Sequence, residues 1–112
     1  MEIGEQLAVA SQEDFASWLA EHGEVKSAIW VLIYKKASGK QIVTDEQLVE
    51  VALCHGWIDG QMKSLDAEKY AQRFSPRRKR SNWSEPNRAI ARRLLAEGRM
   101  TLAGRATLPE DL

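Results

Sequence analysis

Two amphipathic segments in the first half of the chain predict helices. Each begins with a capping-box pattern, continues with apolar side chains at three- and four-residue spacing, and ends at a glycine. The first has Ser11 and Asp14 as its cap, Phe15, Trp18, Leu19 and His22 as its face, and Gly23 at its end. The second has Thr44 and Gln47 as its cap, Leu48, Val49, Val51, Ala52, Leu53 and His55 as its face, and Gly56 at its end.

Other segments have the composition of β-strands. Residues 28–36 are β-branched, aromatic and apolar on both faces until Lys35, which indicates a central strand covered on both sides. Residues 57–66 are expected to be extended or turn-like, and residues 70–75 alternate in polarity until Pro76, which cannot donate to a strand ladder. Residues 1–10 show no strong pattern, and we expect a loose tail or a short strand there.

The C-terminal third returns to helical periodicity. Ser84 is a suitable N-cap, and Pro86 fits the first turn of a helix that ends at Gly98. The apolar face of this helix consists of Ala89, Ile90, Ala91, Leu94 and Leu95. Thr101 is expected to cap a final short helix that continues to about Leu108.

The whole pattern predicts one α+β domain over residues 1–112, in which a small three-stranded, mainly antiparallel sheet packs with about four helices. The chain is 44% hydrophobic and 29% charged, which suits one modest core. No apolar run is long enough to cross a bilayer, and the N-terminal sequence lacks the pattern of a secretion signal. Cys54 is the single cysteine and can form no internal disulfide. These features predict a cytoplasmic protein.

Charge is distributed unevenly along a chain whose formal net charge is zero. The segment from Lys69 to Arg105 contains eleven Lys or Arg and two acidic residues, whereas residues 1–68 contain five Lys and twelve Asp or Glu. A concentrated positive field attracts anionic partners. The field alone does not distinguish a phosphate, a nucleic acid, a lipid headgroup or the protein's own acidic half.

The positive charge is densest just before the helix that begins at Ser84, in a cluster of Arg73, Arg77, Arg78, Lys79 and Arg80. Arginine binds phosphate oxygens in bidentate geometry, a helix N-terminus favours anions, and a tryptophan can stack on a base or sugar. We therefore expect a ligand-binding site that contains Trp57, Asp59, Arg73, Arg77, Arg80, Trp83, Ser84, Asn87 and Arg88. The alternative is a solvated loop whose arginines pair with acidic residues such as Asp59, Asp66 and Glu68.

Asp59 is the one candidate for catalysis. A carboxylate between Trp57 and a glycine can act as a general acid or base, but an Asp-Gly pair more often makes a turn. We favour a structural pairing in which Asp59 forms a buried salt bridge with Arg73 or Arg77.

No metal site or other catalytic group is expected. Cys54 and His55 are adjacent on a helix, so their side chains diverge and do not form a nucleophile–base pair. Two histidines and one cysteine give no metal-ligand spacing, and no cofactor motif is present.

Several ordered segments are specific when taken together. They are FASWLAEH, IWVLIYKKASGK, Ala52-Leu53-Cys54, Gly56-Trp57-Ile58-Asp59-Gly60, the Arg-Phe-Ser-Pro-Arg run at 73–77, Ser81-Asn82-Trp83-Ser84, and Glu97-Gly98-Arg99-Met100. From Phe15 to Gly104 the chain resembles the YdeI/OmpD-associated family, also called bacteriocin-protection proteins. His55 departs from the pattern at a position where an aromatic such as Phe is more usual. The resemblance implies a stress-related role in protection from bacteriocins or antimicrobial peptides and a link to an outer-membrane porin, without a mechanism.

Three functions remain open at this point. The favoured one is a binding module for an anionic small molecule or phosphate-containing ligand. Nucleic acid is a less favoured ligand, because the domain is not basic overall and has no recognised nucleic-acid motif. The second is an enzyme that uses Asp59 as general base with arginines stabilising charge. The third is an interaction protein whose charge asymmetry drives partner docking or assembly into a homo-oligomer.

Overall fold

The computed structural model describes residues 3–78 and 82–112. Its elements in chain order are β1 (Gln6–Ala8), α1 (Gln12–His22), β2 (Ile29–Tyr34), the 3-10 helix η1 (Lys36–Ser38), α2 (Asp45–Cys54), β3 (Trp57–Ser64), β4 (Lys69–Pro76), α3 (Glu85–Ala96) and α4 (Leu102–Arg105). Over the described residues the fold is α+β with four α-helices, in agreement with the sequence-based prediction.

The strands form one mixed sheet in the order β1-β2-β4-β3. β4 pairs antiparallel with both β2 and β3, whereas β1 runs parallel to β2. The prediction of a three-stranded sheet is therefore wrong by one strand, and residues 6–8 form the short strand that was the alternative to a loose tail. The missing strand is only three residues long, which is too short for an alternating pattern to be recognised.

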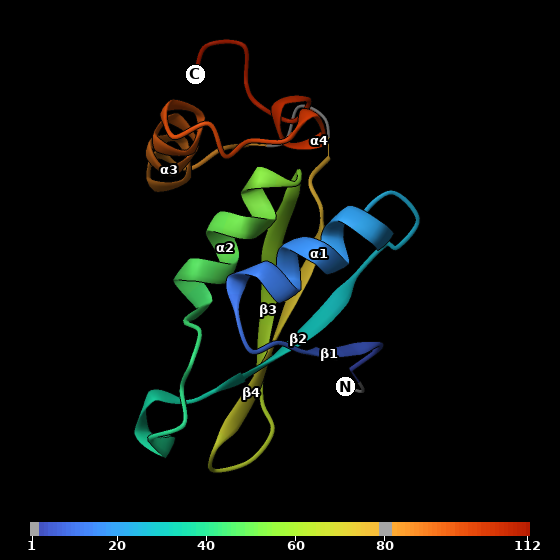
Figure 1. The fold of residues 1–112 in the computed structure, drawn as a ribbon, viewed down its shortest axis with the longest axis vertical. Helices are drawn as coiled ribbons and strands as arrows, with labels where there is room; N and C mark the ends of the chain where they lie inside the picture. The colour runs from blue at the N-terminus through green and yellow to red at the C-terminus, as the bar shows by residue number, and fades with distance from the viewer. Residues whose placement is uncertain (1–2, 79–81) are drawn as a thin grey trace.

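Helices α1 and α2 lie on the same face of the sheet, and α3 and α4 lie beyond one end of it (Figure 1). The main core is formed between these two helices and the sheet. Its buried residues are Phe15, Leu19, Ile29, Val31, Ile33, Val43, Leu48, Val51, Ala52, Trp57 and Phe74. Trp30 is also buried, although strand alternation directs its side chain to the face opposite Ile29 and Val31. The first half of β2 is thus buried on both faces, as predicted.

The predicted helix starts are confirmed by their caps. The side chains of Ser11, Thr44, Ser84 and Thr101 each accept a hydrogen bond from a backbone N–H of the first turn that follows. At Thr44 the capping box with Gln47 is complete. The last helix ends at Arg105, three residues earlier than expected.

A second, smaller core joins α2 to the C-terminal helices. Its buried members are Leu53, Cys54, Leu94 and Met100, and half-buried Trp83 packs against them. The backbone N–H and the hydroxyl of Thr101 both donate to the carbonyl of Cys54, at 3.0 and 2.6 Å. These contacts hold Trp83, just before α3, and Thr101, just before α4, at the end of the sheet where the candidate site lies.

Candidate functional site

A concave surface of about 430 Å³ lies where the start of β3, the end of β4 and the start of α3 meet. We call it the α3 depression. It is lined by Ile58, Asp59, Ser75, Pro76, Arg77, Arg78, Asn82, Ser84 and Asn87. Four of the residues expected at a ligand site are therefore brought together here: Asp59, Arg77, Ser84 and Asn87.

Arg77 is held rigidly at the wall of this depression. Its backbone N–H donates to Gly56 O at 2.8 Å, and its Nη1 donates to Asn82 O at 3.3 Å. The guanidinium carbon lies 3.8 Å from the ring centre of Trp83, a cation–π contact, and only 9% of the residue is exposed. Burial lowers the pKa of Arg77, and the negative charge of Asp59 opposes that shift. An arginine stays protonated in proteins, so the depression has a fixed positive charge.

Trp83 supports Arg77. One face of its ring is covered by the guanidinium, and the residue also packs against the second core. This arrangement differs from the expectation that Trp83 stacks on a base or sugar. An arginine fixed by stacking loses less side-chain entropy when it binds a ligand than a free one does.

The start of α3 contributes the positive end of its helix dipole to the depression, more than it contributes backbone N–H donors. The hydroxyl of Ser84 accepts the backbone N–H of Asn87 at 3.2 Å, and Pro86 has no N–H. The helix dipole still favours a negative group near this end. The charged donors for an anion therefore come from Arg77 and Arg78, and the amide of Asn87 and the hydroxyl of Ser84 can add uncharged ones.

Three predicted residues lie elsewhere. Trp57 is 2% exposed and packs edge-on against Trp18 at 5.8 Å between ring centres, so the expectation that it lines a pocket is wrong. Arg73 does not line the depression; it pairs in register with Trp30. Arg88 does not line it either. Its side chain is 17% exposed and forms ion pairs with Glu85 at 3.4 Å and Asp111 at 3.3 Å.

Two members of the basic run remain to be placed. Arg80 lies outside the described residues, as do Lys79 and Ser81. Arg78 is exposed and lines the α3 depression, although the sequence-based site did not include it. Its position in the basic run was the only signal available in the sequence.

A second concave surface of about 470 Å³ adjoins the first. We call it the acidic depression. It is lined by Asp45, Glu46, Val49, Glu50, Asp59, Asn87, Ile90 and Arg93. Asp59 and Asn87 line both surfaces. Sequence analysis missed this feature because its walls come from α2 and α3, whose contact no local pattern reveals.

The α3 depression contains few groups for acid–base or nucleophilic chemistry among the described residues. Asp59 is the only carboxylate among the described residues that line it, and no histidine, lysine or cysteine accompanies it there. The buried Cys54 has a pKa raised chiefly by burial, so its thiol is protonated at neutral pH. The described residues contain no group of His, Cys, Asp or Glu able to hold a metal ion.

A family model described as a domain of unknown function, DUF8412, matches residues 7–107. The chain belongs to this family. No curated protein and no solved structure matches it. Among the helices of the described ranges 3–78 and 82–112, none is long and apolar enough to span a membrane.

Proposed function

We propose that this DUF8412 protein binds small phosphate-containing anions in the α3 depression. The observation that carries the proposal is the presence of Arg77 and Arg78 on one concave surface at the N-terminus of α3. Two guanidinium groups and a helix dipole outweigh the single described carboxylate there, Asp59.

The lining residues have distinct roles under this proposal. Arg77 supplies a preorganised charge because Trp83 and Asn82 O hold it in place. Arg78 is exposed and can close on a bound phosphate with its planar fork. The amide of Asn87 adds an uncharged donor one turn into α3, and Asp59 limits how many negative charges the surface accepts.

The segments that resemble the YdeI/OmpD-associated family support the same location. Residues 56–60 lead into and begin β3, and residues 73–77 end β4, so both segments reach the depression. We propose that anion binding here is the activity behind that resemblance, including any part in protection from bacteriocins.

Calorimetric titration with methyl phosphate tests the proposal. We expect binding at low ionic strength that weakens about tenfold or more in Arg78→Ala, since a charged hydrogen bond contributes roughly 1.5–3 kcal/mol. Arg92→Ala is the matched control, because Arg92 is an exposed arginine of α3 that does not line the depression. Absence of binding, or equal affinity of Arg78→Ala and wild type, would refute the assignment.

A short fluorescent DNA and the matching RNA in the same experiment test the nucleic-acid alternative. A general phosphate-backbone reader would give a different result. Small phosphates would not bind, oligonucleotide binding would fall steeply with salt, and Arg78→Ala and Arg92→Ala would weaken it equally.

A further inference from the structure

The α3 depression and the acidic depression adjoin, because Asp59 and Asn87 line both, and we call the two together the trough. The two ends of the trough have opposite charge. Arg77 and Arg78 lie at one end, and Asp45 and Glu46 lie at the other. A surface of this kind favours a ligand that has both signs of charge.

The negative charge at the acidic end is only partly neutralised. Glu50 is engaged by Arg93 at 2.6 Å and by Arg99 at 3.4 Å. Within the part of the chain that the structure describes, no ion pair closer than 4.0 Å involves Asp45 or Glu46. Their carboxylates therefore give this end an excess of negative charge.

The middle of the trough suits an aliphatic chain. Val49 of α2 and Ile90 of α3 line the acidic depression between its charged residues, and both are half-buried. Long amines place their methylene groups on apolar surface while the ammonium reaches polar partners. Asn87, which faces both depressions, can donate to an oxyanion or accept from an ammonium.

From this arrangement we infer that the trough binds a zwitterion, in which a phosphate group is joined by a short aliphatic segment to a primary amine. The phosphate lies at Arg77 and Arg78, the methylene groups lie on Val49 and Ile90, and the ammonium lies at Asp45 and Glu46. The inference rests on the proposed phosphate site and adds the other half of the ligand.

A matched ligand series tests the inference. Linear aminoalkyl phosphates with two to six carbons are compared by calorimetry with alkyl phosphates of the same length that lack the amine. We expect the amine to increase affinity about tenfold at the best chain length. The double variant Asp45→Asn/Glu46→Gln should lose this gain and keep the affinity for the alkyl phosphate. Glu13→Gln, which alters an exposed acid in the first turn of α1, should behave as wild type.

The outcomes separate the inference from the proposed function. Alkyl phosphates that bind with no gain from the amine would overturn the zwitterion and leave the phosphate site standing. A gain that survives in the double variant would also overturn it, because the amine would then not lie at Asp45 and Glu46. If neither the aminoalkyl phosphates nor the alkyl phosphates bind, both the zwitterion inference and the proposed phosphate site are refuted.

Discussion

Gly104 is the residue at which α4 meets the end of α2. A Cβ at this position would overlap the backbone carbonyl of Cys54, which already accepts two hydrogen bonds from Thr101. Overpacking against fixed backbone costs roughly 1–3 kcal/mol, and the propensity gain of alanine over glycine, about 1 kcal/mol in a helix interior, is smaller in this four-residue helix. We predict that Gly104→Ala lowers the free energy of unfolding by about 1–2 kcal/mol in urea titrations. Gly60→Ala is the control, because the atom nearest to a Cβ at that position would be Arg73 O, 3.7 Å away. A Gly104→Ala variant as stable as wild type would contradict this packing.

His55 gives the fold a predictable pH response. It is half-buried at the C-cap of α2, and burial lowers its pKa below the ordinary value of 6.5. As pH falls through 6.5, the unfolded chain takes up a proton that the folded protein still excludes, so stability decreases until the lowered folded pKa is passed. We predict that the free energy of unfolding is lower at pH 5.5 than at pH 7.5. In His55→Phe, the free energy of unfolding should differ less between pH 5.5 and pH 7.5 than it does in wild type. An equal difference in wild type and His55→Phe would refute this role of His55.

Among the elements, β3 has an irregularity beside the site that a single buried side chain maintains. Gly60 and Gln61 lie opposite Arg73 between the pairs Asp59–Phe74 and Met62–Gln72, which is a β-bulge. Gln72 is 2% exposed, and its Nε2 donates to the carbonyls of Gly60 at 2.8 Å and Gln61 at 3.3 Å. Asp59, which lines both depressions, immediately precedes this bulge, so the hydrogen bonds of Gln72 stabilise the backbone that follows it.

We predict that Gln72→Leu destabilises the protein by about 1–2 kcal/mol, because it removes two hydrogen bonds to the bulge that each contribute roughly 0.5–1.5 kcal/mol. Amide hydrogen exchange in β3 around the bulge should accelerate more than in β2. Gln61→Ala, a change at an exposed residue of the same bulge, is the control. Unchanged exchange in Gln72→Leu would show that the bulge forms without the glutamine.

The elements also show why some features could be predicted and others could not. The helix starts at Ser11, Thr44 and Ser84 were predicted correctly because a cap depends on residues within one turn. The strand β1 could be given only as an alternative to a loose tail, because its order comes from pairing with β2. Trp57 was misplaced for the same kind of reason: its burial depends on Trp18, which lies far away in the sequence.

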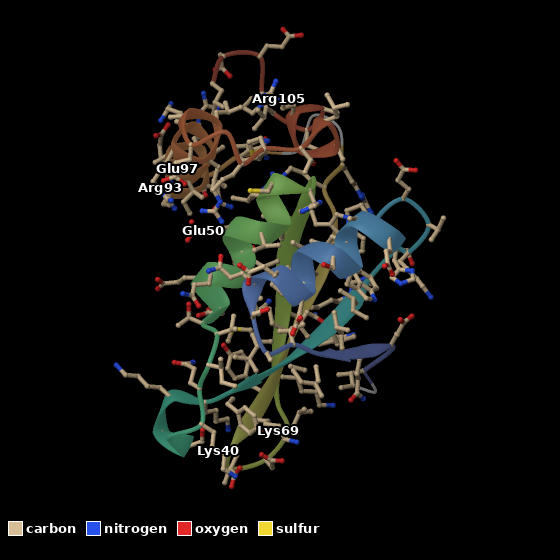
Figure 2. All side chains as sticks on the ribbon, viewed as in Figure 1. Lys40, Glu50, Lys69, Arg93, Glu97 and Arg105 are labelled. Carbon is tan, nitrogen blue, oxygen red and sulfur yellow. The ribbon has the colours of Figure 1, made fainter. Side chains whose placement is uncertain are left out.

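At the scale of the whole molecule, the acidic and basic halves of the chain meet inside one fold. Glu50 of α2 pairs with Arg93 of α3 and with Arg99, and Figure 2 shows Glu50 close to Arg93 and Glu97 where α2 meets α3. Arg88 likewise holds the C-terminal tail through Asp111. Part of the positive charge therefore serves the fold through Arg88, Arg93 and Arg99. These are not the pairs that the structural alternative named, and of its acids Glu68 pairs with Lys40. Arg78 has no ion pair within the described residues and remains accessible to a ligand.

This division of charge makes a last prediction about salt. The Glu50 side chain is 20% exposed and its arginine partners are more exposed, so solvent screens the pairs and their contribution is modest. Glu50→Gln should lower the free energy of unfolding by about 0.5–1 kcal/mol at low ionic strength and by less in 1 M NaCl. Glu24→Gln, at an exposed acid in the loop after α1, should have no such effect. A loss that salt leaves unchanged would show that Glu50 acts through packing between α2 and α3, and the attraction between the two halves would then contribute little to the fold.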